Sequence, residues 1–271
     1  MKLSKLSRSI EGRVAIVTGA ASGMGAATAK LFSECGAKVA ALDRNEGQLM
    51  ELVREIDAAG YSVKGWNLNL LDRNAIDSVI SQVAEYFGGI DILINNAGIS
   101  RFAPIDSEDY EDAWEDSLGV LLTAHIRTIR AALPHLRNSL GGRIVNIAST
   151  EGLGATKNGS PYTAAKTGVI GLSRSLAVEL GDEGITVNCI CPGPIRTGMT
   201  DDIPEANKKE FARRRVALKR YADPEEVAHA TLSLVLPAAS FITGVALPCL
   251  LYTSDAADEG LGVDLGGRRI I

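Results

Sequence analysis

Three residues near the middle of the chain have side chains suited to acid–base chemistry. Tyr162 and Lys166 stand four positions apart, and Ser149 lies thirteen residues before Tyr162. Residues four apart on a helix share one face, so a helix here would bring the ammonium close to the phenol. A neighbouring cation favours the phenolate and lowers the pKa of tyrosine from about 10 toward neutrality. Tyr162 would then act as a general acid or base, while the Ser149 hydroxyl would hold a substrate oxygen.

A glycine-rich segment near the N-terminus has the composition of a phosphate-binding turn. Its glycines are Gly19, Gly23 and Gly25. Glycine allows a tight turn and a close approach of the backbone to a pyrophosphate, and the N-terminus of a following helix favours the negative charge. The spacing differs from the general dinucleotide pattern G-x-G-x-x-G, so a glycine-rich turn that binds nothing remains an alternative.

The residue type at the end of the second predicted strand indicates which dinucleotide would bind. Asp43 lies eighteen residues after Gly25. A carboxylate there accepts hydrogen bonds from an adenosine ribose diol and repels a 2′-phosphate, which favours NAD over NADP. Arg44 is the opposing signal, because a guanidinium can pair with that phosphate.

An isolated tyrosine–lysine pair is typical of an amphipathic surface helix, and the co-occurring glycine turn and carboxylate favour the catalytic interpretation instead.

The elements that must position these residues alternate along the chain. Short apolar, β-rich runs predict strands over residues 14–17, 38–42, 62–68, 90–94, 143–147 and 185–191. Segments of helical period predict helices over residues 23–35, 46–59, 73–87, 111–137, 162–180 and 224–236. Strands and helices in alternation indicate parallel strands joined by right-handed crossovers. We therefore predict an α/β fold over residues 1–248, a single-domain Rossmann-like doubly wound parallel sheet with helices on both faces and ligands beyond the carboxyl ends of its strands.

Further short motifs follow the later strands, namely Asn95-Asn96-Ala97-Gly98 and Pro192-Gly193. With these motifs, the glycine turn and the Ser149, Tyr162 and Lys166 set, residues 10–248 resemble the short-chain dehydrogenase/reductase family. The resemblance implies an NAD(P)-dependent oxidoreductase that interconverts a secondary alcohol and a ketone. It implies that Tyr162 exchanges the proton, that Lys166 lowers its pKa and binds the nicotinamide ribose, and that Ser149 orients the carbonyl. The cofactor-contacting positions that it implies are Gly19, Ser22, Gly23, Met24, Gly25, Asp43, Asn69, Asn95, Ala97, Gly98, Tyr162, Lys166, Gly193 and Thr197.

Two positions depart from the pattern of the family it resembles. Leu121 stands where relatives carry a fourth catalytic residue, an asparagine whose carbonyl holds a water and whose side chain braces the helix. Leucine keeps the carbonyl, so we expect activity to be retained and Leu121→Asn to change turnover by less than about tenfold. Asn69 replaces an aspartate that accepts from the adenine amino group, which is a mild change because an amide oxygen also accepts.

The C-terminal segment is a third and larger departure. Residues 249–271 do not continue as relatives do, and they resemble the translated read-through of a sequencing adapter. The alternative is a divergent tail that packs on the sheet. The small residues and the lack of helical or strand period predict a poorly ordered tail.

Composition excludes several classes of partner. The formal charge of −5 leaves no broad basic field for nucleic acid. No run of about 18 apolar residues occurs, and the charged N-terminus lacks the apolar stretch of a secretory signal, which predicts a cytoplasmic protein without a membrane partner. Four cysteines at these spacings make neither a disulfide framework nor a zinc site, so we expect buried reduced thiols and no metal. They are Cys35, Cys189, Cys191 and Cys249.

Substrate and assembly are less constrained by the sequence. Residues 208–220 carry seven basic side chains and one acidic one. A solvated helix face is the ordinary interpretation, and a site for an anionic substrate such as a carboxylate, phosphate or coenzyme A thioester is the alternative. His125, on the helix predicted over 111–137, is expected to be structural. The family resemblance implies a homotetramer or homodimer built on that helix and the next. The competing functional hypothesis is a cofactor-binding regulator or inactive scaffold of the same fold.

Overall fold

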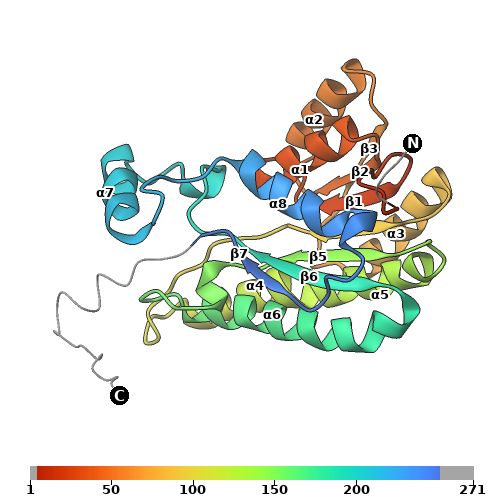
Figure 1. Ribbon diagram of the computed structural model, residues 1–271. Coiled ribbons are helices and arrows are strands. Elements are labelled where there is room, and N and C mark those ends of the chain that lie inside the picture. Colours follow the sequence, from red (N-terminus) through yellow and green to blue (C-terminus); the bar gives the residue numbers. More distant parts are fainter. Residues whose placement is uncertain (1–4, 251–271) are drawn as a thin grey trace.

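The protein is a parallel seven-stranded sheet between two layers of helices (Figure 1). The structure, a computed structural model, describes residues 5–250. The strands run in the order β3-β2-β1-β4-β5-β6-β7, and every neighbouring pair is parallel. Their bounds are β1 (Val14–Thr18), β2 (Lys38–Asp43), β3 (Val63–Asn67), β4 (Ile92–Asn95), β5 (Arg143–Ile147), β6 (Thr186–Cys191) and β7 (Ala246–Pro248). This confirms the predicted Rossmann-like doubly wound fold.

Helices cover both faces of the sheet. One face packs against α1 (Gly23–Glu34), α2 (Glu46–Ala58) and α8 (Pro224–Val235). The other packs against α3 (Arg73–Phe87), α5 (Ala124–Arg137) and α6 (Ser160–Leu180). Helix α4 (Tyr110–Leu118) precedes α5, and α7 (Glu205–Arg215) projects beyond the sheet (Figure 1).

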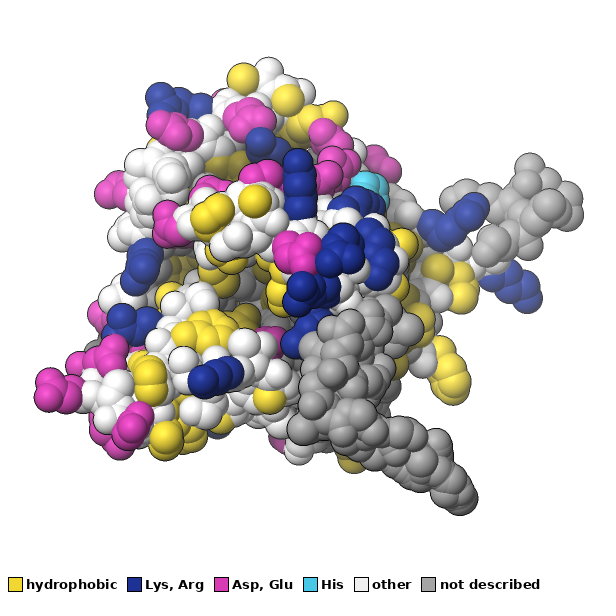
Figure 2. Space-filling model, turned by 90° about the vertical axis from the view of Figure 1, so that its left-hand side faces the viewer, with side chains coloured by type: hydrophobic (Ala, Val, Ile, Leu, Met, Phe, Trp, Pro, Cys, Tyr) yellow, Lys and Arg dark blue, Asp and Glu magenta, His cyan; other side chains and the backbone are white. Residues whose placement is uncertain are grey.

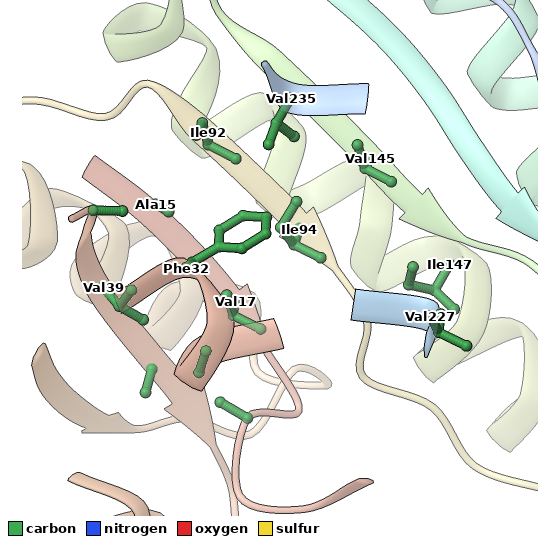
Figure 3. Packing of buried hydrophobic residues seen from close by; sticks show 14 of the residues in the cluster. Ala15, Val17, Phe32, Val39, Ile92, Ile94, Val145, Ile147, Val227 and Val235 are labelled. Carbon is green, nitrogen blue, oxygen red and sulfur yellow. The ribbon is translucent and has the colours of Figure 1, made fainter. Parts of the chain in front are cut away.

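The strands alternate their side chains between the two cores, as parallel strands buried on both faces do. In β1, Ala15 and Val17 face α1 and α8, where Phe32 of α1 fills the centre of the cluster (Figure 3). Val14 and Ile16 face the opposite cluster with α3 and α5. A shift of one residue in register would exchange these faces, so the apolar pattern fixes how the strand ends are placed.

The helix predicted over 111–137 is present as one helical run, but it is not α-helical throughout. A π-helical turn at Gly119–Thr123 separates α4 from α5, and the N–H of Ala124 donates to the carbonyl of Gly119. The periodicity of apolar residues continues through the turn, so sequence did not reveal it. A single π-turn within a helix is a local bulge that occurs often at functional sites.

Residues 251–271 lie outside the described residues, so most of the predicted tail is not tested. Its first two residues pack against the domain. The N–H of Cys249 donates to the carbonyl of Cys191 at 3.1 Å, and Leu250 packs against Ala212, Val216 and Tyr221. All four cysteines are free thiols; Cys189 and Cys191 are buried as predicted, whereas Cys35 is partly buried and Cys249 is exposed.

The strand order reverses between β1 and β4. The chain runs outward from β1 to β3, then crosses over to place β4 on the other side of β1. Loops leaving β1 and β4 therefore diverge to opposite sides and open a crevice at the carboxyl ends of the strands. This crevice is where ligands are expected in such sheets.

Candidate active site

A cavity of about 690 Å³ lies at this crevice. Figure 2 shows this side of the molecule, hollowed between its upper and lower parts, with Lys and Arg side chains gathered beside the hollow. The cavity wall brings together residues from both halves of the chain that the sequence predicted for the site. They are Gly19, Ser22, Gly23, Met24, Asp43, Asn69, Ala97, Gly98, Tyr162, Lys166 and Thr197. Gly25, Asn95, Ser149 and Gly193 do not line this cavity.

The glycine turn has the shape that its sequence predicted. Gly19 and Gly23 have φ of +66° and +54°, a backbone conformation that favours glycine. Ser22 is the N-cap of α1, and its side chain makes no capping hydrogen bond. The first N–H groups of α1 therefore point toward the cavity without a side-chain cap, which suits a bound phosphate.

Gly25 packs closely within the turn and does not line the cavity, and its cofactor contact stays a prediction. It is buried, and a methyl group added there would overlap with the Gly19 carbonyl oxygen and lie 2.5 Å from the Asn96 amide nitrogen. The absence of a side chain at Gly25 thus lets α1 approach the turn closely.

Asn95 is buried and does not line the cavity, whereas its neighbour Asn96 does, and the cofactor contact of Asn95 stays a prediction. Asn95 is 1% exposed, donates to Asn146 at 2.9 Å and accepts from Thr128 at 2.7 Å. Asn96 lines the cavity, and its amide donates to the carbonyls of Thr18 and Gly19. Strand alternation carried a signal for this difference, because Asn95 falls on the same face of β4 as Leu93, which packs under α5.

Asp43 is held rigidly at the end of β2. One carboxylate oxygen accepts from the N–H of Ala21 at 3.0 Å and the other from the N–H of Asn45 at 2.8 Å. The carboxylate thereby joins the glycine turn to the start of α2 at the cavity wall. Arg44 lines the same wall and is exposed.

Tyr162 and Lys166 lie on the first two turns of α6, on the cavity side. Lys166 is 3% exposed, and its ammonium donates to the Ile147 carbonyl at 2.7 Å and lies 5.8 Å from the centre of the Tyr162 ring. Burial lowers the pKa of Lys166 to about 8. The Tyr162 ring is partly buried and stacks on Phe102 at 5.9 Å between centroids.

Ser149 and Gly193 lie next to the cavity, at the ends of β5 and β6. The Ser149 hydroxyl accepts from the N–H of Glu151 at 3.1 Å, which caps the short helical turn Thr150–Gly152. Gly193 lies under the side chain of Leu250, which a methyl group at this position would overlap. Thr197, further along the same loop, reaches back over Gly23, so the two halves of the site meet there.

Comparison with known proteins identifies the family of this chain. The sequence model of the family described as enoyl-(acyl carrier protein) reductase matches residues 19–249. The chain belongs to the short-chain dehydrogenase/reductase family. It is 39% identical to (2S)-[(R)-hydroxy(phenyl)methyl]succinyl-CoA dehydrogenase subunit BbsD of Thauera aromatica, over 88% of this chain and 95% of that protein. It is 38% identical to 3-oxoacyl-[acyl-carrier-protein] reductase FabG of Thermotoga maritima, over 87% of this chain and 95% of that protein.

Solved structures of dehydrogenases share the fold. A dehydrogenase/reductase from Sinorhizobium meliloti has a TM-score of 0.83 and 34% identity, over 89% of this chain and 95% of that one. A putative NAD(P)-dependent gluconate 5-dehydrogenase from Beutenbergia cavernae, with bound NADP at low occupancy, also has a TM-score of 0.83, with 33% identity over 89% of this chain and 96% of that one. As a member of the short-chain dehydrogenase/reductase family, this chain is an oxidoreductase that uses NAD(P).

No helix between residues 5 and 250 is long and apolar enough to cross a membrane. Over the same residues, no group of three or more His, Cys, Asp or Glu side chains is arranged to hold a metal ion.

Proposed function

We propose that this member of the short-chain dehydrogenase/reductase family interconverts a secondary alcohol and a ketone, with Tyr162 as the general acid or base. The observation that carries the proposal is that Tyr162 and Lys166 line the same cavity as the glycine turn. The proton-transfer group, Tyr162, and the glycine turn that would bind the dinucleotide thus line the same cavity. When bound, the nicotinamide supplies the hydride for ketone reduction or accepts it in alcohol oxidation.

The dinucleotide fits the residues of the cavity. The uncapped N-terminus of α1 and the bare backbone at Gly19 and Gly23 suit the pyrophosphate. Asp43 suits the adenosine ribose, and Lys166 has N–H groups beyond the one donated to Ile147 with which to hold the second ribose.

Each catalytic side chain has a definite task in this proposal. In alcohol oxidation the Tyr162 phenolate takes the hydroxyl proton, and in ketone reduction the phenol returns it. The buried ammonium of Lys166 stabilises the phenolate by its charge. The Ser149 hydroxyl already accepts from Glu151, so its own hydrogen can be donated to the substrate oxygen.

The decisive variant is Tyr162→Phe, which removes the proton-transferring oxygen and keeps the ring that stacks on Phe102. We expect NADH formation from a panel of secondary alcohols to fall by about 10²–10⁴-fold. Melting temperature and NAD binding should stay unchanged, since the packing is retained. Substantial turnover by Tyr162→Phe would contradict the proposal. If the wild-type protein binds the dinucleotide but turns over none of the panel, the regulator or scaffold hypothesis is favoured.

We infer NAD as the preferred dinucleotide. The Asp43 carboxylate is fixed at the cavity wall by two backbone N–H groups, and its charge disfavours a 2′-phosphate. Arg44 beside it and the NADP-bound relative make NADP the alternative to test. We expect kcat/KM to favour NAD by at least about tenfold, and Asp43→Ala to shrink that ratio. Equal or better use of NADP by the wild-type protein would reverse the assignment.

The assembly proposed from the family resemblance is a homotetramer or homodimer built on α4, α5 and α6. Val178 of α6 is 85% exposed and Ile126 of α5 is 39% exposed, which supports an apolar contact on these helices. Light scattering on the purified protein tests this directly. A monomer at micromolar concentration would exclude it.

A further inference from the structure

A half-exposed aromatic ring stands beside Tyr162. Phe102 belongs to the loop between β4 and α4 and is 46% exposed. Its ring stacks on the ring of Tyr162, with 5.9 Å between the centroids and 23° between the planes. Tyr162 lines the cavity, as do residues 98–101, which lead to Phe102. The Phe102 ring therefore stands at the rim of the cavity, next to the phenol.

The chain on either side of Phe102 is held in place by a separate contact. The Arg101 guanidinium forms an ion pair with Asp116 of α4 at 3.3 Å. The N–H of Ala103, which is buried, donates to the carbonyl of Asn158 at 2.9 Å. Because both neighbours are tied to other elements, the position of Phe102 is set by the fold around it.

Gly159 provides the space that the Phe102 ring fills. It precedes α6 and lies three residues before Tyr162. A methyl group added there would lie 2.7 Å from a carbon of the Phe102 ring and 3.0 Å from the Thr156 carbonyl oxygen. The backbone itself does not require glycine, because its φ of −96° is open to other residues. The missing side chain at this position thus lets the two rings meet.

The surface that borders the phenol is aromatic and carries little net charge. Phe102 and Tyr162 present two nearly parallel rings. Met199 lines the same cavity and is 52% exposed. Aromatic rings favour stacked or edge-to-face contacts with other rings, and a thioether also makes favourable contacts with them. Arg101 is the nearest charged neighbour along the chain, and its pairing with Asp116 offsets its charge.

We propose that Phe102 is a specificity-determining residue that favours substrates with an aryl group on the carbinol carbon. The aryl group rests against the exposed part of the Phe102 ring while the hydroxyl reaches Tyr162 and Ser149. The inference deepens the proposed function and rests on it, because the reaction at Tyr162 is what places the substrate beside Phe102.

The kinetic test compares 1-phenylethanol with 1-cyclohexylethanol, which share a carbon skeleton and differ in the flatness of the ring. The two alcohols also differ in intrinsic reactivity, so the readout is the change in the ratio of their kcat/KM values between variants. We expect Phe102→Leu to lower the phenyl-to-cyclohexyl ratio by about two- to tenfold, through a higher KM for 1-phenylethanol. Phe102→Tyr keeps an aromatic ring and should retain the wild-type ratio.

Gly159→Ala tests the geometry without removing the ring. Its methyl group would displace the Phe102 ring from Tyr162, so we expect the ratio to fall as it does in Phe102→Leu. Gly171→Ala is the matched control, because Gly171 lies on the same helix and no described atom lies within 4 Å of an added methyl group. This variant should keep the wild-type ratio.

The outcome for a purely structural Phe102 is distinct. If the ring only supports Tyr162, Phe102→Leu lowers kcat for both alcohols alike and leaves the ratio unchanged, which overturns the inference. A ratio that falls as far in Gly171→Ala as in Gly159→Ala also overturns it.

A binding measurement separates this inference from the proposed function. Calorimetry compares acetophenone with cyclohexyl methyl ketone on Tyr162→Phe in the presence of the reduced dinucleotide, since this variant keeps the stacked ring and lacks the proton-transferring oxygen. We expect the added change Phe102→Leu to weaken acetophenone relative to the cyclohexyl ketone by about two- to tenfold. An unchanged ratio of dissociation constants, or no binding of either ketone, overturns the inference. If this binding difference is present and the wild-type protein oxidises neither alcohol, the result contradicts the proposed function instead.

Discussion

Lys166 illustrates a functional residue that lowers the stability of its own fold. Its charged form is buried, and its pKa falls from an ordinary value near 10.5 to about 8. Between these two values the unfolded chain holds the proton that the folded chain has released, so stability rises with pH across that window. Below about pH 8 both states are protonated, and the full cost of the buried charge, about 3 kcal/mol, is present.

Lys166→Met should therefore stabilise the protein at pH 7. The variant loses the hydrogen bond to Ile147, which costs about 1 kcal/mol, and removes the larger cost of the buried charge. We expect a net gain of about 2 kcal/mol at pH 7 that disappears above about pH 10, together with loss of turnover. Thermal melting at several pH values measures it. A variant less stable than the wild-type protein at pH 7 would show that the ammonium is better solvated than its burial indicates.

The sequence predicted the residues of the site whose roles follow from chemical type. Asp43, Tyr162 and Lys166 were found because a carboxylate, a phenol and an amine at these positions have few alternative tasks. Asn95 was predicted to contact the cofactor although Asn96 lines the cavity, because two adjacent asparagines are chemically identical and only strand alternation decides which one faces the cavity. The lack of hydrogen-bond partners at His125 among the described residues depends on which side chains surround it in the fold, and no local sequence pattern predicts those neighbours.

At the scale of elements, the turn from β1 to α1 is the most tightly constrained part of the site. Gly25→Ala should test this, because its methyl group would overlap the Gly19 carbonyl and crowd Asn96. The Gly19 carbonyl belongs to the backbone, and the Asn96 amide is hydrogen-bonded to backbone carbonyls, so moving either group costs free energy. We expect a loss of about 3 kcal/mol, a fall in melting temperature of roughly 6–12 °C, and weaker dinucleotide binding.

Gly181→Ala provides the matched control for that substitution. Gly181 has helical backbone angles at the end of α6, and nothing lies within 4 Å of an added methyl group. Alanine in such a position is neutral or stabilises by up to about 1 kcal/mol. If the two alanine variants melt alike, close packing at the turn is not what Gly25 provides.

Helices with a strong apolar periodicity were predictable from the sequence, and elements without such a periodicity were not. Helices α1, α2, α3 and α8 have apolar stripes that match their predicted ranges to within two residues. Helix α7 buries only Lys208 and Ala212, so its sequence lacks such a stripe. Around the π-turn at Gly119–Thr123 the buried residues Ser117, Leu121 and His125 are spaced four apart, which an ordinary α-helix also allows, so the sequence did not reveal the turn.

The charge of residues 208–220 is partly balanced within the folded domain. Arg213 and Arg214 pair with Glu210, and Arg220 pairs with Glu226. Arg196 pairs with Glu205 at the start of α7. These exposed pairs contribute little stability each, but they reduce the field available for an anionic substrate. The arrangement favours the interpretation of a solvated helix face over that of a dedicated anion site.

At the scale of the whole molecule, Leu250 links the end of the sheet to the projecting α7. Its side chain packs against Ala212, Val216 and Tyr221, next to Gly193. Leu250→Ala should loosen this cluster, lower the stability by about 1 kcal/mol and raise substrate KM, because the segment 197–199 that leads to α7 lines the cavity. Melting, kinetics and hydrogen exchange of α7 measure it. Leu218→Ala is the control, because Leu218 is exposed on the same segment and should change nothing.

One buried chain of hydrogen bonds runs in a single direction from α5 across the ends of β4 and β5 to α6, all on one face of the sheet. The Thr128 hydroxyl donates to Asn95, Asn95 donates to Asn146, and Asn146 donates to Ser173 of α6. Each amide accepts a hydrogen bond with its carbonyl oxygen from one neighbour and donates one from its NH₂ group to the next. Flipping either amide would therefore place two donors together on one side and two acceptors together on the other. A single substitution here would leave a buried polar neighbour without its partner, so this chain can be replaced only by several simultaneous substitutions.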